Sequence, residues 1–384
     1  MDFTLTDEQT MLRDAVRSYL AGRYPLVESR SAARSEIGWQ PAVWEAFASE
    51  LGILAATLPE SVGGLGGGPE EMMVIAEELG GALVVEPYVG TAVVGAALLR
   101  GSGGAAADAL LTAIADGGAR TAFALTEPES GRESWDVQTT AVRDGDEYVL
   151  SGAKIVVADL PVATHLIVAA RTAGGRLDRD GISLFLLEFD PQAPPAGVSA
   201  QYFRTIDDHH TGDLVLADLR VPASALLGAE GGAWDVIERA LDDGAAAVCC
   251  EGVGIMRRVV ADTVAYAKQR RQFGVPIGSF QALQHRMVDM SLELEQSVAA
   301  SYLAVLNLDA EPQVRRRAVS AAKITIARAA RFVGQNAVQL HGGMGMTEEL
   351  AIGHCFKRLT AIETEFGSAT DHLHRYAEAS AQGG

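Results

Sequence analysis

A basic and aromatic string in the last third of the chain is the densest group of side chains suited to bind a ligand. It reads Arg270-Arg271-Gln272-Phe273-Gly274, and Phe280 and Gln281 follow a few residues later. A guanidinium presents a planar pair of donors to phosphate oxygens. An aromatic ring such as Phe273 offers a face to an adenine base. Arginines that only complement a helix dipole would explain the charges, but not the aromatic and amide side chains around them. We therefore interpret the string as a site for the phosphates and base of a ligand.

Other common chemical motifs do not occur in the sequence. No glycine-rich dinucleotide fingerprint follows a predicted strand, and there is neither a P-loop nor a serine nucleophile elbow. The three cysteines, Cys249, Cys250 and Cys355, lack metal-ligand spacing, and His209-His210 has no third ligand nearby. NAD, ATP and serine-esterase chemistry are thus unsupported, and we expect no metal site.

Length and composition limit the class of protein. The chain has 384 residues, of which 48% are apolar and 21% charged, so we expect a globular protein of two or three domains. A net charge of −19 leaves no basic stripe for a nucleic acid. No apolar run approaches the ~20 residues that cross a bilayer, and no basic leader precedes an apolar stretch at the N-terminus. We expect a cytoplasmic protein without membrane insertion.

The elements that must position the ligand-binding string divide the chain into three stretches. Residues 1–118 show helical periodicity and begin with a capping box at Thr6 and Gln9. Residues 119–230 alternate with a period of two and contain no helix of useful length, which predicts a largely antiparallel sheet, barrel-like or a sandwich. Residues 231–384 carry long amphipathic helices joined by short loops, as in a four-helix bundle. The predicted fold class is therefore multidomain α+β, with a helical domain, a β domain and a helical bundle in that order.

Taken together, these strings resemble a known family. Arg270–Gly274 is similar to the acyl-CoA dehydrogenase signature, and Gln339-Leu340-His341-Gly342-Gly343 resembles a second motif of that family. The resemblance extends to Phe3–Gln9, to the loop Pro59–Gly67 and to Leu125-Thr126-Glu127-Pro128, so it covers all three stretches in order. It implies the acyl-CoA dehydrogenase fold, an FAD cofactor and α,β-desaturation of an acyl-CoA thioester.

The resemblance also implies which residues hold the FAD. In this family each subunit lends part of its surface to the flavin of its neighbour. On the lent side, Arg270 and Gln272 should hold the pyrophosphate, and the remaining contacts should come from Phe273, Phe280, Gln281, Gln339, Gly342 and Gly343. On the side that holds the isoalloxazine of the chain's own flavin, the resemblance implies Leu125 and Thr126, together with a Trp-x-Thr strand.

The second side departs from the family pattern. Val156 stands where the tryptophan is expected, and Ala158 stands where the threonine is expected. Val156 has no large flat face, and Ala158 has no hydroxyl to donate to a flavin. Residues 129–135 replace a short Gly-Ser-Asp turn of the family, and Trp135 within them is a candidate substitute for the missing aromatic ring.

The residue that would remove the substrate α-proton is also out of place. A carboxylate accepts such a weakly acidic proton best in an apolar site, because burial raises its pKa. The two positions that the family uses for this base correspond to Phe366 and Gly244, and neither can take a proton. Glu365 and Asp243 are each one residue away, a rotation of about 100° on a helix. Glu365 is the first candidate base and Asp243 the second.

The sequence leaves three hypotheses open. In the leading one, the chain is a base-lacking partner subunit of a heteromeric dehydrogenase, similar to the small subunits of pimeloyl-CoA or steroid-type enzymes. In the second, it is a self-sufficient homo-oligomer that uses Glu365 as its base. In the third, it is a non-enzymatic acyl-CoA- or protein-binding module. For the two enzymes, the resemblance implies a dimer or tetramer that shares the FAD site and an electron-transfer flavoprotein-type acceptor.

Overall fold

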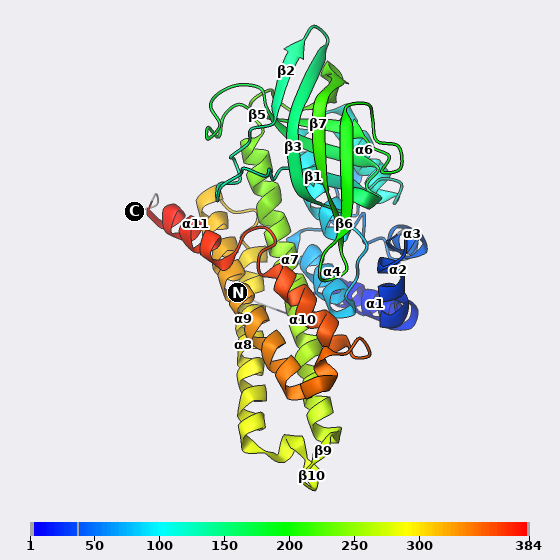
Figure 1. The fold of residues 1–384 in the computed structure, drawn as a ribbon, viewed down its shortest axis with the longest axis vertical. Helices are drawn as coiled ribbons and strands as arrows, with labels where there is room; N and C mark the ends of the chain where they lie inside the picture. The colour runs from blue at the N-terminus through cyan, green and yellow to red at the C-terminus, as the bar shows by residue number, and fades with distance from the viewer. Residues whose placement is uncertain (1–3, 37, 382–384) are drawn as a thin grey trace. The chain divides into compact units, whose positions relative to one another are not determined.

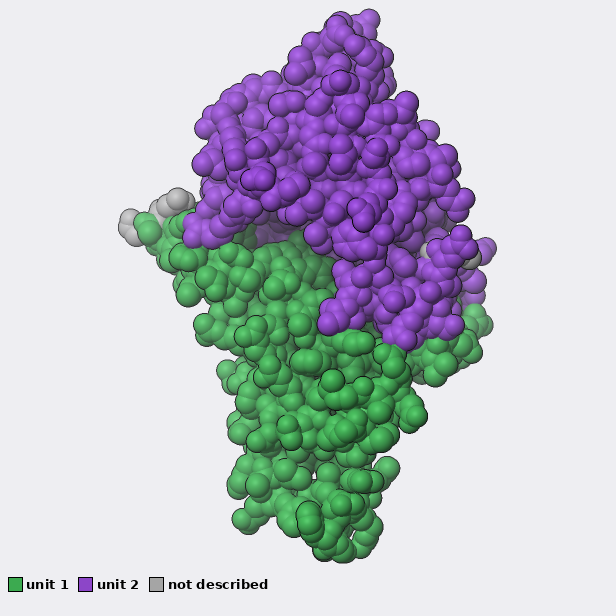
Figure 2. Space-filling view, viewed as in Figure 1, with its two compact units in different colours: residues 1–29, 68–84, 245–384 green, residues 30–67, 85–244 purple. Residues whose placement is uncertain are grey.

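The computed structural model describes residues 4–36 and 38–381, and the chain divides into two compact units (Figure 1 and Figure 2). Unit 1 comprises residues 1–29, 68–84 and 245–384, and unit 2 comprises residues 30–67 and 85–244. Phe3, the first residue of the N-terminal string, lies outside the described residues. Helices, a sheet and a second set of helices follow one another along the chain in the predicted order.

Unit 1 is built from helices. They are α1 (Asp7–Arg23), the start of α2 (Leu26–Ala33), α4 (Pro69–Ala82), most of α7 (Trp234–Gln269), α8 (Gln281–Val305), α9 (Pro312–His341), α10 (Ala351–Ile362) and α11 (Ala369–Ala381). Helix α9 packs against α8, α10 and α11 and so connects the C-terminal helices (Figure 1). Its buried face carries mainly alanine, valine and isoleucine, which permits close packing.

The predicted capping box at the start of α1 is confirmed. The Thr6 hydroxyl accepts a hydrogen bond from the Gln9 N–H at 3.2 Å, and the Gln9 side chain accepts one from the Thr6 N–H at 3.1 Å. These two bonds satisfy donors that the first turn of a helix leaves open. The start of α1 is therefore determined by residues that are close neighbours in the sequence.

Unit 2 contains an eight-stranded sheet. Its strands are β1 (Thr121–Ala124), β2 (Thr140–Asp144), β3 (Glu147–Ala158), β4 (His165–Arg171), β5 (Ile182–Glu188), β6 (Val198–Arg204), β7 (His210–Pro222) and β8 (Leu226–Leu227). The order is β6-β7-β3-β2-β4-β5-β8, with β1 paired to β4. The β1–β4 and β2–β4 pairs are parallel and the others are antiparallel, so the predicted, largely antiparallel sheet is confirmed (Figure 1).

The core of the sheet comes from the inward-facing side of these strands. Leu150, Leu166 and Leu214 are fully buried within it, and the rings of Tyr148 and Phe185 meet edge to face with centroids 5.1 Å apart. The helical elements of unit 2 include α3 (Pro41–Ser49), a π-helical turn η2 (Val89–Gly95), α5 (Ala96–Ser102) and α6 (Ala105–Ala115). None of the described helices is both long and apolar enough to cross a membrane.

Candidate functional site

The basic and aromatic string, for which ligand binding is predicted, forms a small hairpin beyond the end of α7. Strands β9 (Arg271–Gln272) and β10 (Val275–Pro276) pair in an antiparallel register, with Phe273 and Gly274 as the turn. Both turn residues have positive φ, 55° and 84°, as a two-residue hairpin turn requires. Glycine tolerates this backbone conformation, whereas a bulky residue such as Phe273 is strained in it. Residues 270–280 are called the arm below.

The arm exposes side chains that have few partners inside the protein. Phe273 is 91% exposed and meets Phe280 edge to face at 6.2 Å between ring centroids. Arg271 donates to the Gly274 carbonyl at 3.2 Å. Arg270 is exposed, and its guanidinium forms no ion pair with any residue that the structure describes. An exposed guanidinium on the same short arm as two exposed aromatic rings is suited to bind a phosphate and an adjoining base from outside the chain.

The second string lies at the end of α9. The helix ends at His341, and Gly342 follows with a φ of 59°. An added Cβ at Gly342 or Gly343 would meet no atom within 4 Å, so the backbone of both glycines faces open space. Gln339 is exposed on the last turn of the helix. The Gly342 N–H itself donates to the Gln339 carbonyl, so what this turn leaves accessible to a ligand is the exposed Gly342-Gly343 surface and the Gln339 amide side chain.

Two side chains bring the arm and the second string together within unit 1. The ring of Tyr266, on the last turn of α7, stacks on the ring of His341, with centroids 4.3 Å apart and planes 26° apart. The Tyr266 carbonyl accepts the N–H of Arg270 at 2.8 Å. Of the predicted lent residues, Phe273 and Phe280 touch, while Gln281 begins α8 beside them and is exposed.

In unit 2, the segment at Leu125 and Thr126 is anchored through its backbone. The carbonyl of buried Leu125 accepts the Lys154 ammonium at 3.1 Å, and the Thr126 carbonyl accepts the N–H of Ile155 at 2.9 Å. Lys154 is fully buried and forms an ion pair of 2.7 Å with buried Glu127. The side chain of Thr126 itself is exposed, so it remains accessible while its backbone is held.

Burial and pairing act against each other on the pKa of both Lys154 and Glu127. Burial lowers the pKa of Lys154 to about 8, against the raising effect of Glu127. For Glu127 burial raises the pKa, but the charge and hydrogen bond of Lys154 and the N–H of Thr139 outweigh it, and the pKa is lowered. Both groups are therefore charged near neutral pH, and the pair anchors the Leu125–Glu127 segment. Sequence reasoning missed this pair, because nothing in the spacing marks residues that meet across the sheet.

The strand expected to carry the aromatic platform is bulged. The pairing of β3 with β7 shifts register between Lys154 and Val157, and Val156 has a φ of 51°. Its N–H donates to the Asp213 carboxylate at 2.9 Å, and its side chain is 57% exposed. A β-branched residue at positive φ is a true outlier. Val156 thus occupies an outward-facing position, but it presents two methyl groups where the family has an indole.

Trp135 is engaged elsewhere in unit 2. Its ring meets that of Trp234 edge to face at 5.4 Å, and the Arg179 guanidinium lies 4.1 Å from the ring centroid. Its carbonyl accepts from Arg171 at 3.2 Å. These contacts fix the ring against Trp234 and Arg179, which weighs against its use as a substitute aromatic platform.

The first candidate base, Glu365, is an ion-pair partner of a buried arginine. Its Oε2 lies 2.9 Å from Arg358 Nη1, and the same guanidinium binds Glu251 through two bonds of 2.5 and 2.7 Å. Arg358 and Glu251 are both buried. Together, Arg358, Glu251 and Glu365 are called the Arg358 cluster. Protonation of Glu365 would break its ion pair with Arg358, which disfavours Glu365 as a base.

The second candidate base, Asp243, lies in an environment that favours its protonated form. It lies on α7 in unit 2, and its side chain is 7% exposed. Oδ1 accepts from Arg239 Nε at 2.9 Å, whereas Oδ2 is buried without a hydrogen-bond partner in the described part of the chain. Burial raises the pKa of Asp243 to about 6, although Arg239 opposes the shift. Of the two carboxylates, Asp243 is therefore the better proton acceptor.

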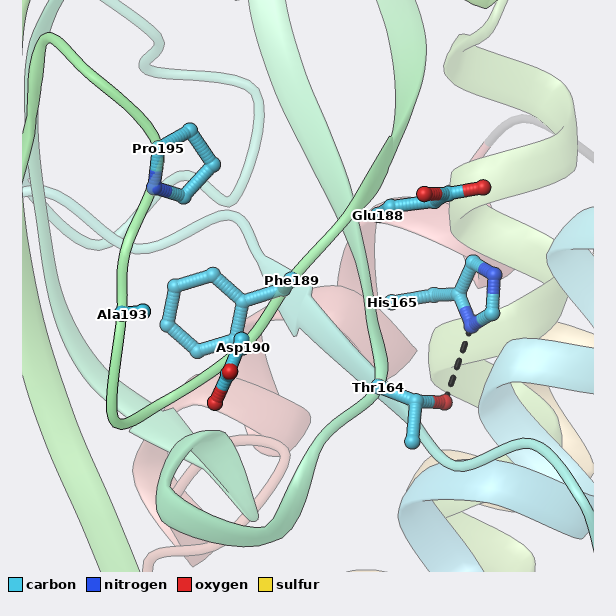
Figure 3. Close-up of a pocket in the computed structure, with 7 residues that line it drawn as sticks. All are labelled: Thr164, His165, Glu188, Phe189, Asp190, Ala193 and Pro195. Carbon is cyan, nitrogen blue, oxygen red and sulfur yellow. Dashed lines mark hydrogen bonds between the residues drawn. The ribbon is translucent and has the colours of Figure 1, made fainter.

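A hollow of about 480 Å³ on unit 2 contains none of the predicted site residues. It is lined by Thr164, His165, Glu188, Phe189, Asp190, Ala193 and Pro195 (Figure 3). His165 contacts the Thr164 hydroxyl through Nδ1 at 2.9 Å, and burial lowers its pKa. Two carboxylates and neither lysine nor arginine line the hollow, so it is unsuited to a phosphate-bearing ligand such as coenzyme A. No group of three or more metal-ligating side chains occurs among the described residues.

Comparison with known proteins gives full-length matches. Family models for the acyl-CoA dehydrogenase N-terminal, middle and C-terminal domains match residues 6–118, 122–219 and 231–380. Over 379 residues, the chain is 30% identical to a probable acyl-CoA dehydrogenase, YngJ, of Bacillus subtilis (strain 168), and the match covers 98% of both chains.

Solved structures agree with these matches. The chain is similar to a variant of the Tcur3481-Tcur3483 steroid ACAD, with 29% identity, 99% coverage of both chains and a TM-score of 0.88. It is also similar to the ChsE4-ChsE5 complex of Mycobacterium tuberculosis, with 25% identity, coverage of 100% of this chain and 99% of that chain, and a TM-score of 0.88. The chain therefore belongs to the acyl-CoA dehydrogenase family, flavoprotein oxidoreductases that act on CH–CH bonds and typically use FAD.

Proposed function

We propose that this chain is the partner subunit of a heteromeric, FAD-dependent acyl-CoA dehydrogenase and completes the flavin site of its neighbour. The observation that carries the proposal is a contrast between two charged groups. Arg270 on the exposed arm has no ion pair within the described chain, whereas the base candidate Glu365 is bound to Arg358. Bound FAD would supply the hydride acceptor for α,β-desaturation of the acyl-CoA.

On the lent side, each residue has a distinct task. Arg270 and Gln272 bind the pyrophosphate, because guanidinium and amide donors match its oxygens. Phe273 and Phe280 offer ring faces to the adenosine, and Gln281 lies beside them. Gln339 and the open backbone of Gly342 and Gly343 approach the same portion of the cofactor. The exposure of these groups supports a ligand that is shared with a neighbouring subunit.

On the chain's own side, the residues fit a flavin poorly. Leu125 and Thr126 present a fixed edge, but Val156 gives no aromatic face and Ala158 no hydroxyl. The two solved relatives described above are named as a steroid enzyme and as a two-component complex. These names support a heteromeric enzyme and a bulky acyl-CoA, such as a steroid side-chain or pimeloyl-type thioester, as the substrate class. An electron-transfer flavoprotein-type acceptor is the electron partner expected for such an enzyme.

The proposal is tested by purifying the chain alone and together with its candidate partner dehydrogenase subunit. The lone chain should carry little flavin in its absorbance spectrum and should not oxidise acyl-CoA, while the complex should do both. Arg270→Ala in this chain should then lower the flavin content of the complex, with Arg331→Ala as a control at another exposed arginine. Full flavin occupancy and turnover by the lone chain would overturn the proposal.

A self-sufficient homo-oligomer is the second candidate function. The sequence names Glu365 as the first candidate base of such an enzyme, but Glu365 is ion-paired with buried Arg358. Burial raises the pKa of Asp243 to about 6, which favours Asp243 as the base instead. In this case Asp243→Asn should abolish turnover by the lone chain with flavin still bound, and Glu365→Gln should not. A non-enzymatic binding module, the third candidate, requires that no flavin binds in any oligomer.

A further inference from the structure

His341 stands inside the second family string, but none of the flavin contacts proposed above uses it. It is buried at the last residue of α9, directly before the open pair Gly342 and Gly343. Its Nδ1–H donates to the Ala337 carbonyl at 2.9 Å, one helical turn earlier. This bond fixes the ring orientation, with the ring plane against Tyr266. A buried ring whose orientation is fixed in this way can hold two neighbouring segments at a constant spacing.

Tyr266 makes contacts in two directions. Its ring stacks on His341 at 4.3 Å between centroids, and its hydroxyl lies 3.5 Å from the His341 carbonyl. Its own carbonyl accepts the N–H of Arg270 at 2.8 Å, and the Arg270 carbonyl in turn accepts the N–H of Ile277 at 2.8 Å. One residue therefore contacts the base of the arm through its backbone and the end of α9 through its side chain.

We infer that Tyr266 and His341 are positioning residues that set the spacing between the arm and the Gly342-Gly343 turn, so that both can contact one FAD. This inference rests on the proposed function. The tip of the arm is itself open to solvent, since Phe273 is 91% exposed and Phe280 38% exposed. The stack lies where the two strings leave their helices, so its loss would let each string move independently of the other.

The turn after His341 is packed tightly against α9 and so moves together with His341. The stack of His341 on Tyr266 then connects this turn to the arm. An added Cβ at Gly345 would meet the Val338 carbonyl at 2.8 Å and the His341 Cβ at 3.1 Å. The turn is thus packed directly onto the last turn of α9. Movement of the His341 ring would be transmitted to Gly342 and Gly343, since the three residues are consecutive. The Tyr266 ring is what limits that movement from the side of α7.

The experiment titrates the purified enzyme, reconstituted with its partner subunit where one is needed, with FAD and separately with FMN. His341→Ala removes the stack, and His341→Phe retains a flat ring at the same position. Because an aromatic pair is worth on the order of a tenfold change in an equilibrium constant, His341→Ala should weaken FAD binding by about tenfold. FMN lacks the adenosine that the two strings share, so its affinity should stay within about twofold of the original. His341→Phe should restore FAD binding.

Tyr266→Leu repeats the test from the α7 side and covers the case in which His341→Ala does not fold. Arg270→Ala serves as the reference for the proposed function. If Arg270→Ala leaves FAD affinity unchanged, the proposed function fails. If Arg270→Ala weakens FAD binding but His341→Ala and Tyr266→Leu do not, the positioning role alone is overturned. An equal loss of FAD and FMN affinity would also overturn it, because that result indicates general destabilisation.

Discussion

The arm and the Arg358 cluster lie in the same compact unit but differ in the burial and ion pairing of their charged side chains. In the arm, Arg270 has no ion-pair partner in the described chain, and Phe273 is 91% exposed. In the cluster, Arg358 is 5% exposed and binds both Glu251 and Glu365. A buried ion-paired network specifies structure, whereas exposed groups without internal partners are available to a ligand or a neighbouring subunit. The contrast separates the proposed binding surface from a scaffold.

A second scaffold contact lies next to the cluster. Lys323 is fully buried, and its ammonium donates to the carbonyls of Ile362 and Gly367 at 2.8 Å each. Burial lowers the pKa of Lys323. The Nε2–H of His372 donates to the Phe366 carbonyl at 2.9 Å. The turn at Phe366, to which the resemblance assigns a base position, is therefore fixed by interactions that need no substrate.

The largest effect is expected from breaking the cluster. Arg358→Ala leaves Glu251 as a buried charge without its bidentate partner, which should lower the free energy of unfolding by about 3–5 kcal/mol. Chemical denaturation measures this loss. The matched control is Arg331→Ala, which breaks the ion pair of a 66% exposed arginine with Glu363 and should cost less than about 1 kcal/mol. Equal losses in the two variants would contradict the assignment of the cluster as a scaffold.

Asp243 sharpens the comparison. It is buried like the cluster, but only one of its two carboxylate oxygens has a hydrogen-bond partner among the described residues. Burial raises its folded pKa from 3.8 to about 6, so its contribution to stability is complete below pH 3.8 and is lost as the pH rises through about 6. Asp243→Asn removes the titration. The variant should be more stable than the original protein at neutral pH, by at most about 3 kcal/mol, and the difference should vanish in acid, near the unfolded pKa. Unfolding curves at several pH values measure it, and a pH-independent difference would refute the assignment.

Arg270→Ala should affect binding and leave stability unchanged. A charge-assisted hydrogen bond to a phosphate is worth about 1.5–3 kcal/mol, so FAD affinity should fall by roughly 10- to 100-fold. The free energy of unfolding should change by less than about 0.5 kcal/mol, because the side chain is exposed and has no ion pair in the described chain. Lys268→Ala, at an exposed cation on the preceding turn, is the control. A stability loss without a loss of FAD affinity would place Arg270 with the scaffold.

The smallest effect is expected at the tip of the arm. Phe273→Asn gives an Asn-Gly turn, which favours the positive φ values of 55° and 84° found there. Stability should rise by up to about 1 kcal/mol, because the left-handed conformation costs a bulky residue about that much. FAD affinity should fall at the same time, since the ring is lost. Calorimetry together with an FAD titration measures both, and a variant that is less stable would show that Phe273 is not strained.

The order of the elements could be predicted from the sequence because periodicity is a local property. The capping box at Thr6 and the alternation in β3 and β7 are each contained in a few neighbouring residues. The parallel pairing of β1 with β4 joins residues far apart in the sequence, and no pattern in Thr121–Ala124 predicts this pairing. The resemblance to the family identified the arm residues as candidate FAD contacts. Their position on an exposed hairpin agrees with a role in binding.

The environments of the candidate bases could not be predicted. Glu365 meets Arg358 seven residues earlier, across the turn that follows α10, and Arg358 meets Glu251 on another helix. The Oδ2 atom of Asp243 is buried without a hydrogen-bond partner among the described residues, which only the folded chain reveals. Lys154 and Glu127 are 27 positions apart and pair through the folding of the sheet. Such contacts depend on tertiary packing, which residue spacing does not encode.

The bulge at Val156 limits which side chains this position of β3 can carry. The backbone there is already turned outward, with the Asp213 carboxylate fixing its N–H and the side chain 57% exposed. Like Phe273, a tryptophan is bulky and would be strained at a φ of 51°. An indole at this position would therefore require the bulge between Lys154 and Val157 to relax. The missing aromatic ring is thus a matter of backbone as well as of side chain.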